Sequence, residues 1–268
     1  MISKLVLTFL LVSITFIFIN FFSFNILEEA YGINETQKNN NNKTVNFEKL
    51  VSEYENWWIN VPVEEDSQEA DNPCVIHNTD SVIFLHDPFQ MGNFENICTI
   101  PHKSLFFPFY IGWCDNGSPG YYGTESYNKL LECALDANRG LVTMNAYLDD
   151  KKIVDVLIDN TDVHNLRVLY NKSLDNYYKE IGPTDFFDLT VTNKTQFQTF
   201  EKPEDFASSP VKYKAVAYCF CGFIDKDTIS PGNHQLSYFT KIEGSGGLDK
   251  TKGYDIENHL TLTIIHLY

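Results

Sequence analysis

The chain is poor in basic residues, and arginine is the scarcest of them. Its 268 residues contain 20 Lys and Arg against 36 Asp and Glu, which gives a formal net charge of −16. Arg139 and Arg167 are the two arginines, and the sequence contains no basic cluster. Because a negative field repels phosphate backbones and anionic lipid surfaces, we expect no nucleic-acid partner. The simplest role of the acidity is to keep the protein soluble.

The local signatures of common enzyme classes are missing as well. The chain has no Gly-x-Ser-x-Gly, no His-Glu-x-x-His, no Walker loop and no dinucleotide-binding glycine pattern. Its seven histidines, among them His77, His86 and His164, are scattered along the sequence. Paired carboxylates for glycoside hydrolysis need only be close in space, so a hydrolase stays open. The absences favour a non-enzymatic protein without a cofactor.

A long apolar segment opens the chain. Residues 5–27 carry no charge, and Glu28 and Glu29 follow them. The small residues Ala30 and Gly32 fit cleavage by a signal peptidase after residue 32. Because the run is close to the ~20 residues that span a bilayer, residues 1–32 are either a signal peptide or a retained signal anchor. Both alternatives export the remainder, and no other membrane contact is expected.

Composition and apolar spacing predict a tether followed by two helices. The Asn-rich segment 33–46 carries too little apolar surface to offset the entropy of ordering it, so we expect it to be disordered. Apolar residues then recur at helical spacing over 47–59, after the N-cap candidate Asn46. A second stripe predicts a helix over 124–139, which Gly140 ends. Regular stripes of this kind are typical of packing faces.

The rest of the chain is predicted to be mainly β. The strands expected from short β-branched and aromatic runs are 82–86, 96–100, 104–112, 141–148, 152–158, 164–170, 186–191, 212–224, 234–242 and 259–268. Asp149-Asp150-Lys151 is a hairpin candidate, and Ser230 to Asn233 form a turn. In the last strand Thr261 and Thr263 alternate with apolar residues, which predicts one wet face. Residues 47–268 therefore predict a single β-sandwich or jelly-roll-like domain that the two helices cover.

Five aromatic residues and no acidic residue lie in CTIPHKSLFFPFYIGWC, residues 98–114. A strand that is apolar on both faces must be covered on both, so we expect the helices at 47–59 and 124–139 to supply the second cover. Pro108 lacks a ladder donor and predicts a bulge or an edge. These rings are expected to form core. Trp113 is the expected exception, and with Tyr121 and Tyr122 it forms a candidate surface for stacking on a sugar.

Six cysteines in an exported chain predict disulfide bonds, although six allow 15 pairings. Cys219 and Cys221 stand at i and i+2 of a predicted strand, so their side chains share one face. They form either a strained disulfide, two packed thiols, or half of a soft-metal site. In the last case His234 is a candidate third ligand, provided that the two strands flanking the Pro-Gly turn pair.

Two further patterns point to a cation and to a modification. Asp249, Asp255 and Glu257 lie in a glycine-rich segment and offer hard oxygen ligands for calcium, although their spacing does not match an EF-hand, and a solvated loop is the alternative. Five Asn-x-Ser/Thr sequons predict glycosylation in a host that glycosylates exported chains. Those sequons begin at Asn34, Asn42, Asn116, Asn171 and Asn193.

The order of several landmarks resembles a group of exported archaeal and bacterial proteins of unknown function. The landmarks are Trp57-Trp58, Asn72-Pro73-Cys74, CTIPHKSLFFPF, YLDDKKI and ISPGNHQLSY. In the group's signature a small residue or glycine stands where this chain has His102. The resemblance implies export, a β-rich domain and no particular activity. It also implies the disulfide pairs Cys74–Cys98 and Cys114–Cys133, whereas Cys219 and Cys221 are particular to this chain.

Three functions follow from these patterns. The first is a non-enzymatic extracytoplasmic module, secreted or anchored by residues 5–27, that binds a component at the cell surface through loops on a rigid scaffold. The second is a carbohydrate-directed domain, either lectin-like or hydrolytic, with Trp113, Tyr121 and Tyr122 as the candidate contacts. The third is a purely structural surface protein.

Overall fold

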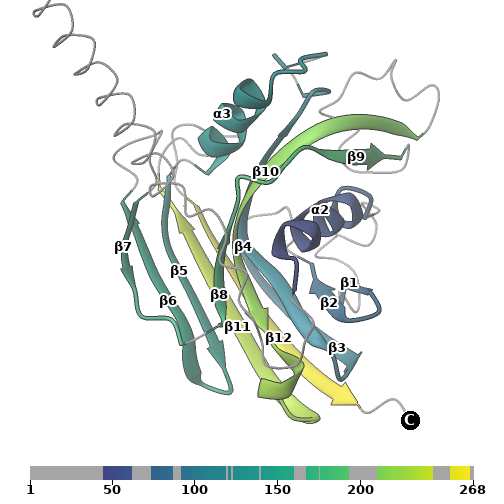
Figure 1. The fold of residues 1–268 in the computed structure, drawn as a ribbon. Coiled ribbons are helices and arrows are strands. Elements are labelled where there is room, and N and C mark those ends of the chain that lie inside the picture. The colour runs from purple at the N-terminus through teal and green to yellow at the C-terminus, as the bar shows by residue number, and fades with distance from the viewer. Residues whose placement is uncertain are drawn as a thin grey trace, which may run out of the picture. The chain divides into compact units, whose positions relative to one another are not determined.

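The computed structural model describes residues 45–61, 74–86, 92–118, 120–121, 123–138, 140–159, 167–174, 176–192, 210–243 and 254–265. Two six-stranded sheets pack face to face in this part of the chain, with two α-helices, so the expected β-sandwich is confirmed (Figure 1). The apolar run 5–27 and nearly all of the segment 33–46 lie outside the described residues. Within the described ranges, no helix is both long and apolar enough to cross a membrane.

One sheet, here called the β4 sheet, has the order β1-β2-β4-β10-β8, and β9 also pairs with β10. Its strands are β1 Ile76–Asn78, β2 Val82–Leu85, β4 Ser104–Asp115, β8 Tyr178–Ile181, β9 Phe187–Val191 and β10 Val211–Ile224. The other, the β11 sheet, has the order β3-β12-β11-β5-β6-β7. Its strands are β3 Gly92–Pro101, β5 Leu141–Leu148, β6 Lys151–Asp159, β7 Arg167–Asn171, β11 Gly232–Ile242 and β12 Tyr254–Ile265. The helices are α2 Phe47–Trp58 and α3 Tyr127–Ala137.

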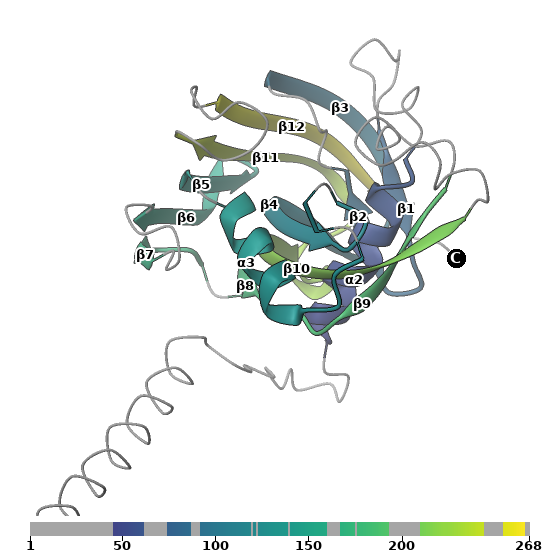
Figure 2. The ribbon, with the colours of Figure 1, turned by 90° about the horizontal axis from the view of Figure 1, so that it is seen from above.

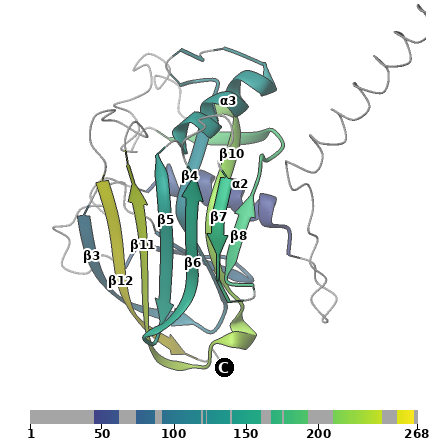
Figure 3. The same ribbon diagram turned by 90° about the vertical axis from the view of Figure 1, so that its left-hand side faces the viewer.

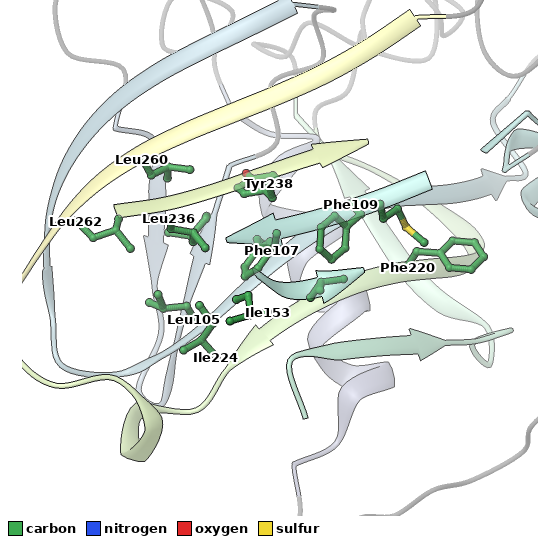
Figure 4. Packing of buried hydrophobic residues seen from close by; sticks show 14 of the residues in the cluster. Leu105, Phe107, Phe109, Ile153, Phe220, Ile224, Leu236, Tyr238, Leu260 and Leu262 are labelled. Carbon is green, nitrogen blue, oxygen red and sulfur yellow. The ribbon is translucent and has the colours of Figure 1, made fainter. Parts of the chain in front are cut away.

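The main core lies between the two sheets. It contains Leu105, Phe107 and Phe109 of β4 together with apolar side chains of β5, β6, β10, β11 and β12 (Figure 4). The rings of Phe107 and Tyr238 lie 4.8 Å apart between centroids and join the sheets directly. Phe106, Phe107 and Phe109 are at most 1% exposed. The prediction that the aromatic run faces inward is therefore confirmed.

Helix α2 covers the outer face of the β4 sheet. The ring of Tyr54 lies 5.8 Å from that of Phe106 and 5.7 Å from that of Phe84. Asn56 and Asn60, one helical turn apart, hydrogen-bond through their carboxamides to backbone groups of β9 and the residue after it. Unpaired strand edges invite pairing with other chains, and these amides satisfy part of that edge from within the molecule.

A bulge in β4 brings α3 to the opposite side of the strand from α2. Phe220 pairs with Tyr110 and Cys221 with Pro108, so Phe109 has no partner on β10 and its carbonyl accepts a hydrogen bond from Thr240 at 2.9 Å. The bulge expected at Pro108 is thus present. The bulge reverses the alternation of inward and outward side chains along β4. Phe109 and the next residue, Tyr110, therefore both contact the core between the sheets.

The residues of β4 beyond the bulge pack against α3. A Cβ on Gly112 would lie 2.2 Å from the Ala134 carbonyl oxygen, and the Tyr110 hydroxyl donates to the Ala137 carbonyl at 3.0 Å. Figure 2 shows α3 over one end of the space between the sheets. Both predicted helices thus pack on the β4 sheet, α2 on its outer face and α3 against the part of β4 that follows the bulge.

Three disulfide bonds connect the described cysteines, and none of these residues is a free thiol. Cys74 precedes β1 in one sheet and Cys98 lies in β3 of the other, so their bond covalently links the two sheets. Cys114 of β4 is bonded to Cys133 of α3, and Cys219 to Cys221 within β10. The two pairs implied by the resemblance are both present. Disulfide bonds are compatible with an extracellular location.

Replacing the inter-sheet bond should destabilise the oxidised protein. We expect the Cys74→Ala/Cys98→Ala variant to lose about 3 kcal/mol of unfolding free energy, because the closed loop restricts the unfolded chain. Urea denaturation of both proteins, each oxidised and each reduced, measures the loss. The gap should close on reduction, since neither protein then has the cross-link. A gap of equal size in the reduced proteins would contradict the loop-closure origin of the effect.

Candidate functional site

The end of β4 and the loop that follows it hold the two described aromatic residues singled out for sugar stacking. Trp113 is half-buried and pairs with Ala217 of β10. Tyr121 is half-buried and packs against the small apolar cluster between β4, β10 and α3. Tyr122 lies outside the described residues. Tyr121 thus has a packing contact that occupies part of its surface, and sugar binding at Trp113 stays a prediction.

A buried carboxylate shapes this loop. Asp115 is fully buried and accepts hydrogen bonds from the Gly117 N–H at 2.7 Å and from the Ser118 hydroxyl at 3.0 Å. Burial raises the pKa of the Asp115 carboxyl, and the hydrogen bonds from Gly117 and Ser118 oppose that rise. A Cβ on Gly117 would lie 2.4 Å from the Tyr213 ring, so glycine is required for this turn. Both acceptor oxygens serve the turn itself, and we assign Asp115 a structural role.

The three residues considered for a soft-metal site do not come together. Cys219 and Cys221 are bonded to each other and fully buried. His234 lies in β11, whereas β10 pairs with β4, β8 and β9, so the hairpin that the site required is not formed. The His234 ring nitrogens lie 2.7 Å from an Asp149 carboxylate oxygen and 2.8 Å from the Ser230 carbonyl oxygen. Among the described residues no group of three His, Cys, Asp or Glu is placed to hold a metal ion.

The residues considered for calcium can be placed only in part. Asp255 and Glu257 are positions of β12, paired in register with Lys241 and Phe239 of β11. Asp249 lies outside the described residues. The backbone at 255 and 257 is therefore a regular strand rather than the loop that the sequence suggested.

Two buried titratable groups lie outside any predicted site. The His86 ring is buried and packs edge-on against Trp57 at 5.8 Å between centroids. Burial lowers the pKa of its imidazole from 6.5 to about 3, so the ring is neutral at physiological pH. Burial also raises the pKa of Tyr178 well above its usual range, with smaller contributions from Glu180 and Tyr218. Both groups are held in their neutral forms, which suits packing.

The outward face of the β11 sheet presents polar side chains at alternate positions of its central strands. Figure 3 shows this sheet with α2 behind it. On β11 and β12 the outward set includes Asn233, Gln235, Ser237, Thr261 and Thr263, while the alternate leucines and isoleucines are buried. None of the described outward side chains on these two strands is acidic. We call this surface the β11 face.

Threonine hydroxyls orient two carboxamides on the β11 face. Thr261 donates to the Gln235 side-chain oxygen at 3.1 Å, and Thr263 donates to that of Asn233 at 3.0 Å. Because the carboxamide oxygens accept these bonds, the NH₂ groups are left as donors. Asn233 and Gln235 are both exposed and stand two residues apart on one strand, roughly 7 Å along it. The pairs thus present two aligned donors to a ligand.

Apolar side chains flank these amides across the sheet. Ile97, in register with Thr261, is 67% exposed, and Tyr147, in register with Ser237, is 37% exposed. On the β6 and β7 side, Asp155 binds Lys152 at 2.8 Å and accepts from the Tyr170 hydroxyl at 2.9 Å. Hydrogen bonding from Lys152 lowers the pKa of Asp155, so this carboxylate is paired. The face therefore combines amide donors, hydroxyls and exposed apolar surface.

The sequence predicted the polar face of β12 but not the residues of β11 that lie beside it. The alternation of Thr261 and Thr263 with buried residues predicted one wet face. Gln235 was part of a predicted strand, and no local pattern indicated that it would stand beside Thr261.

We expect the unfolding free energy of the native protein to fall on acidification more steeply than that of His86→Phe. The unfolded chain binds a proton at position 86 below pH 6.5, whereas the folded chain does so only near pH 3. Stability linked to neutral His86 is therefore complete above pH 6.5 and is lost as the pH falls toward 3, by roughly 1.4 kcal/mol per pH unit. Urea denaturation from pH 7 to pH 4.5 measures both slopes. His77→Phe controls for a ring exchange in the same cluster, and equal slopes in the native and His86→Phe proteins would contradict the assignment.

No family model, no curated protein and no solved structure matches this chain. The resemblance to exported archaeal and bacterial proteins accordingly stays an expectation. The chemistry of the described side chains is the remaining guide to function.

Proposed function

We propose that this protein is an exported, extracytoplasmic binding module, secreted or anchored by residues 5–27, that holds a cell-surface component on its β11 face. The supporting observation is the difference between the two sheets. Helix α2 packs on the outer face of the β4 sheet through Tyr54, whereas the β11 sheet directs Asn233 and Gln235 to solvent. A binding site on sheet strands is held by the scaffold and needs little ordering on association.

Several observations support a binding role outside the cytoplasm. Disulfide bonds persist in oxidising compartments, and the described cysteines are all bonded. Large apolar side chains also remain exposed on the β11 sheet, one on each of five strands. These are Ile97, Tyr147, Leu157, Leu169 and Ile265.

The proposal predicts that one charge on the β11 face abolishes surface binding. We expect Gln235→Arg to reduce binding of the labelled full-length protein to envelope preparations at least tenfold, because the long cation displaces the Thr261 contact and blocks the face. Asn128→Arg, at an exposed position of α3, adds the same charge and is the matched control. Circular dichroism verifies that both variants fold. Unchanged envelope binding by Gln235→Arg would exclude the β11 face.

A carbohydrate is the second candidate function that a specific observation favours. Two oriented carboxamide donors, threonine hydroxyls and the exposed Tyr147 ring match the alternating hydroxyls and apolar faces of a sugar.

The carbohydrate candidate predicts a graded response to loss of the amides. We expect Gln235→Ala and Asn233→Ala each to weaken binding to neutral glycans about tenfold, equivalent to 1.4 kcal/mol for one lost donor. Thr261→Val should weaken it less, because the amide survives but loses its orienting hydroxyl. A glycan array followed by calorimetry measures the series. A loss confined to Trp113→Ala would move the site to the end of β4, and an array without hits would remove the carbohydrate candidate.

A further inference from the structure

Two of the five sequons lie in the described residues, and their surroundings differ. Asn116 follows β4 in the turn shaped by Asp115, and its side chain is half-buried. Asn171 is the last residue of β7, the terminal strand of the β11 sheet, and its side chain is exposed. Sequence alone ranks the two equally, since both are followed by serine at the third position.

Asn116 is fixed by its hydrogen bonds. Its side-chain oxygen accepts from the Lys214 N–H at 2.9 Å, and its own N–H donates to the Lys214 carbonyl at 3.0 Å. Its carbonyl accepts from the Gly123 N–H at 2.7 Å. The next residue, Gly117, lies against the Tyr213 ring. Presenting Asn116 to an enzyme would break this turn and its contact with β10.

Asn171 is held in a conformation that presents its carboxamide nitrogen. The side-chain oxygen accepts from the Ser173 N–H at 2.9 Å, within the tripeptide Asn171-Lys172-Ser173 itself. The Lys172 N–H donates to the Asp155 carbonyl at 3.0 Å, and the Ser173 hydroxyl accepts from the Asp155 N–H at 3.3 Å. These contacts anchor the tripeptide to β6. They use the side-chain oxygen of Asn171 and do not involve its Nδ2 atom. An exposed, preformed bend is accessible without local unfolding.

A bulky polar group at Asn171 would also protect an exposed edge. Among the described strands β7 pairs with β6 alone, and Leu169 and Leu174, two and three residues from Asn171, are 53% and 38% exposed. Exposed apolar edge strands are templates for pairing with other chains, and natural proteins cover or charge them. A glycan is bulky and solubilising, so it would hinder such pairing.

We propose that, of the two described sequons, Asn171 is an N-glycosylation acceptor of the folded domain and Asn116 is not modified. In the transfer, Nδ2 of Asn171 forms a bond to the anomeric carbon of a lipid-linked oligosaccharide. The bond from that carbon to the lipid phosphate oxygen breaks, the phosphate leaves with the electron pair, and Nδ2 loses one proton. This inference rests on the proposed export, because the lipid-linked donor is met outside the cytoplasm, and it requires transfer to the folded domain; it does not depend on the β11 face.

The purified, folded full-length chain, incubated with an oligosaccharyltransferase and a lipid-linked oligosaccharide, tests the selection between the two sequons, and expression in a eukaryotic secretory host tests export. Peptide mass spectrometry after an amidase that converts glycosylated Asn to Asp should find the conversion at Asn171 and not at Asn116. Asn171→Gln and Ser173→Ala should each remove one glycan from the intact protein, and Asn116→Gln should leave its mass pattern unchanged apart from the substitution. Ser173→Ala retains the asparagine, so it separates loss of the sequon from loss of the residue.

The outcomes distinguish this inference from the proposed function. An unmodified Asn171 in a chain that has entered the secretory lumen would overturn the inference and leave the binding module intact. A glycan on Asn116 would contradict the inference that the folded surroundings of the two sequons decide which one is modified. A chain that stays in the cytosol, by protease protection, would contradict export and therefore both proposals.

Discussion

The fold depends on burying β4 on both faces. Its inner face packs across the sandwich, where Phe107 meets Tyr238 at 4.8 Å, and its outer face packs on α2 through Phe106 and Tyr54 at 5.8 Å. The fit tolerates no extra atoms on β10, because a Cβ on Gly222 would lie 2.2 Å from the Phe107 ring. Each buried phenylalanine is worth roughly 1.5–3 kcal/mol of transfer free energy. The covering helix and the second sheet are both needed to bury this strand.

The same strand sets how the chain changes sheets. Two residues separate β3 in one sheet from β4 in the other, and the first of them, His102, lies 2.9 Å from the Lys226 carbonyl oxygen and 2.8 Å from that of Ile229. Those carbonyls belong to the link between β10 and β11, which also crosses between the sheets. The His102 imidazole thus connects the β3–β4 link to the β10–β11 link, and both of these links pass from one sheet to the other. The Cys74–Cys98 bond connects the sheets at another point. The position where the resembling group has a small residue carries a structural contact in this chain.

Periodicity within a segment was readable from the sequence, and pairing between segments was not. Both helices and most strands were predicted, including the two-residue hairpin at Asp149 and Asp150, whose positive φ values of 50° and 64° fit a type I′ turn. The strand β8 was missed, because Tyr178 to Ile181 is short, carries Lys and Glu, and is fixed by its pairing with β10. A metal ligand at His234 required β10 and β11 to pair across the turn at Ser230 to Asn233, but this link crosses between the sheets, so His234 lies in a different sheet from Cys219 and Cys221. Local chemistry does not specify which strand lies next to which.

The difference between the two sheets follows from their sequences and locates the candidate site. β4 and β10 are apolar on both sides over much of their length, so the β4 sheet needs an outer cover and α2 supplies it. In β11 and β12 buried and more exposed side chains alternate. One face of the β11 sheet therefore packs into the core between the sheets, while its other face can carry polar groups. Because the packing of the core does not use Gln235 or Thr261, these positions tolerate selection for a ligand at little cost in stability. A scaffold of this kind separates the residues that hold it together from the residues that recognise a partner.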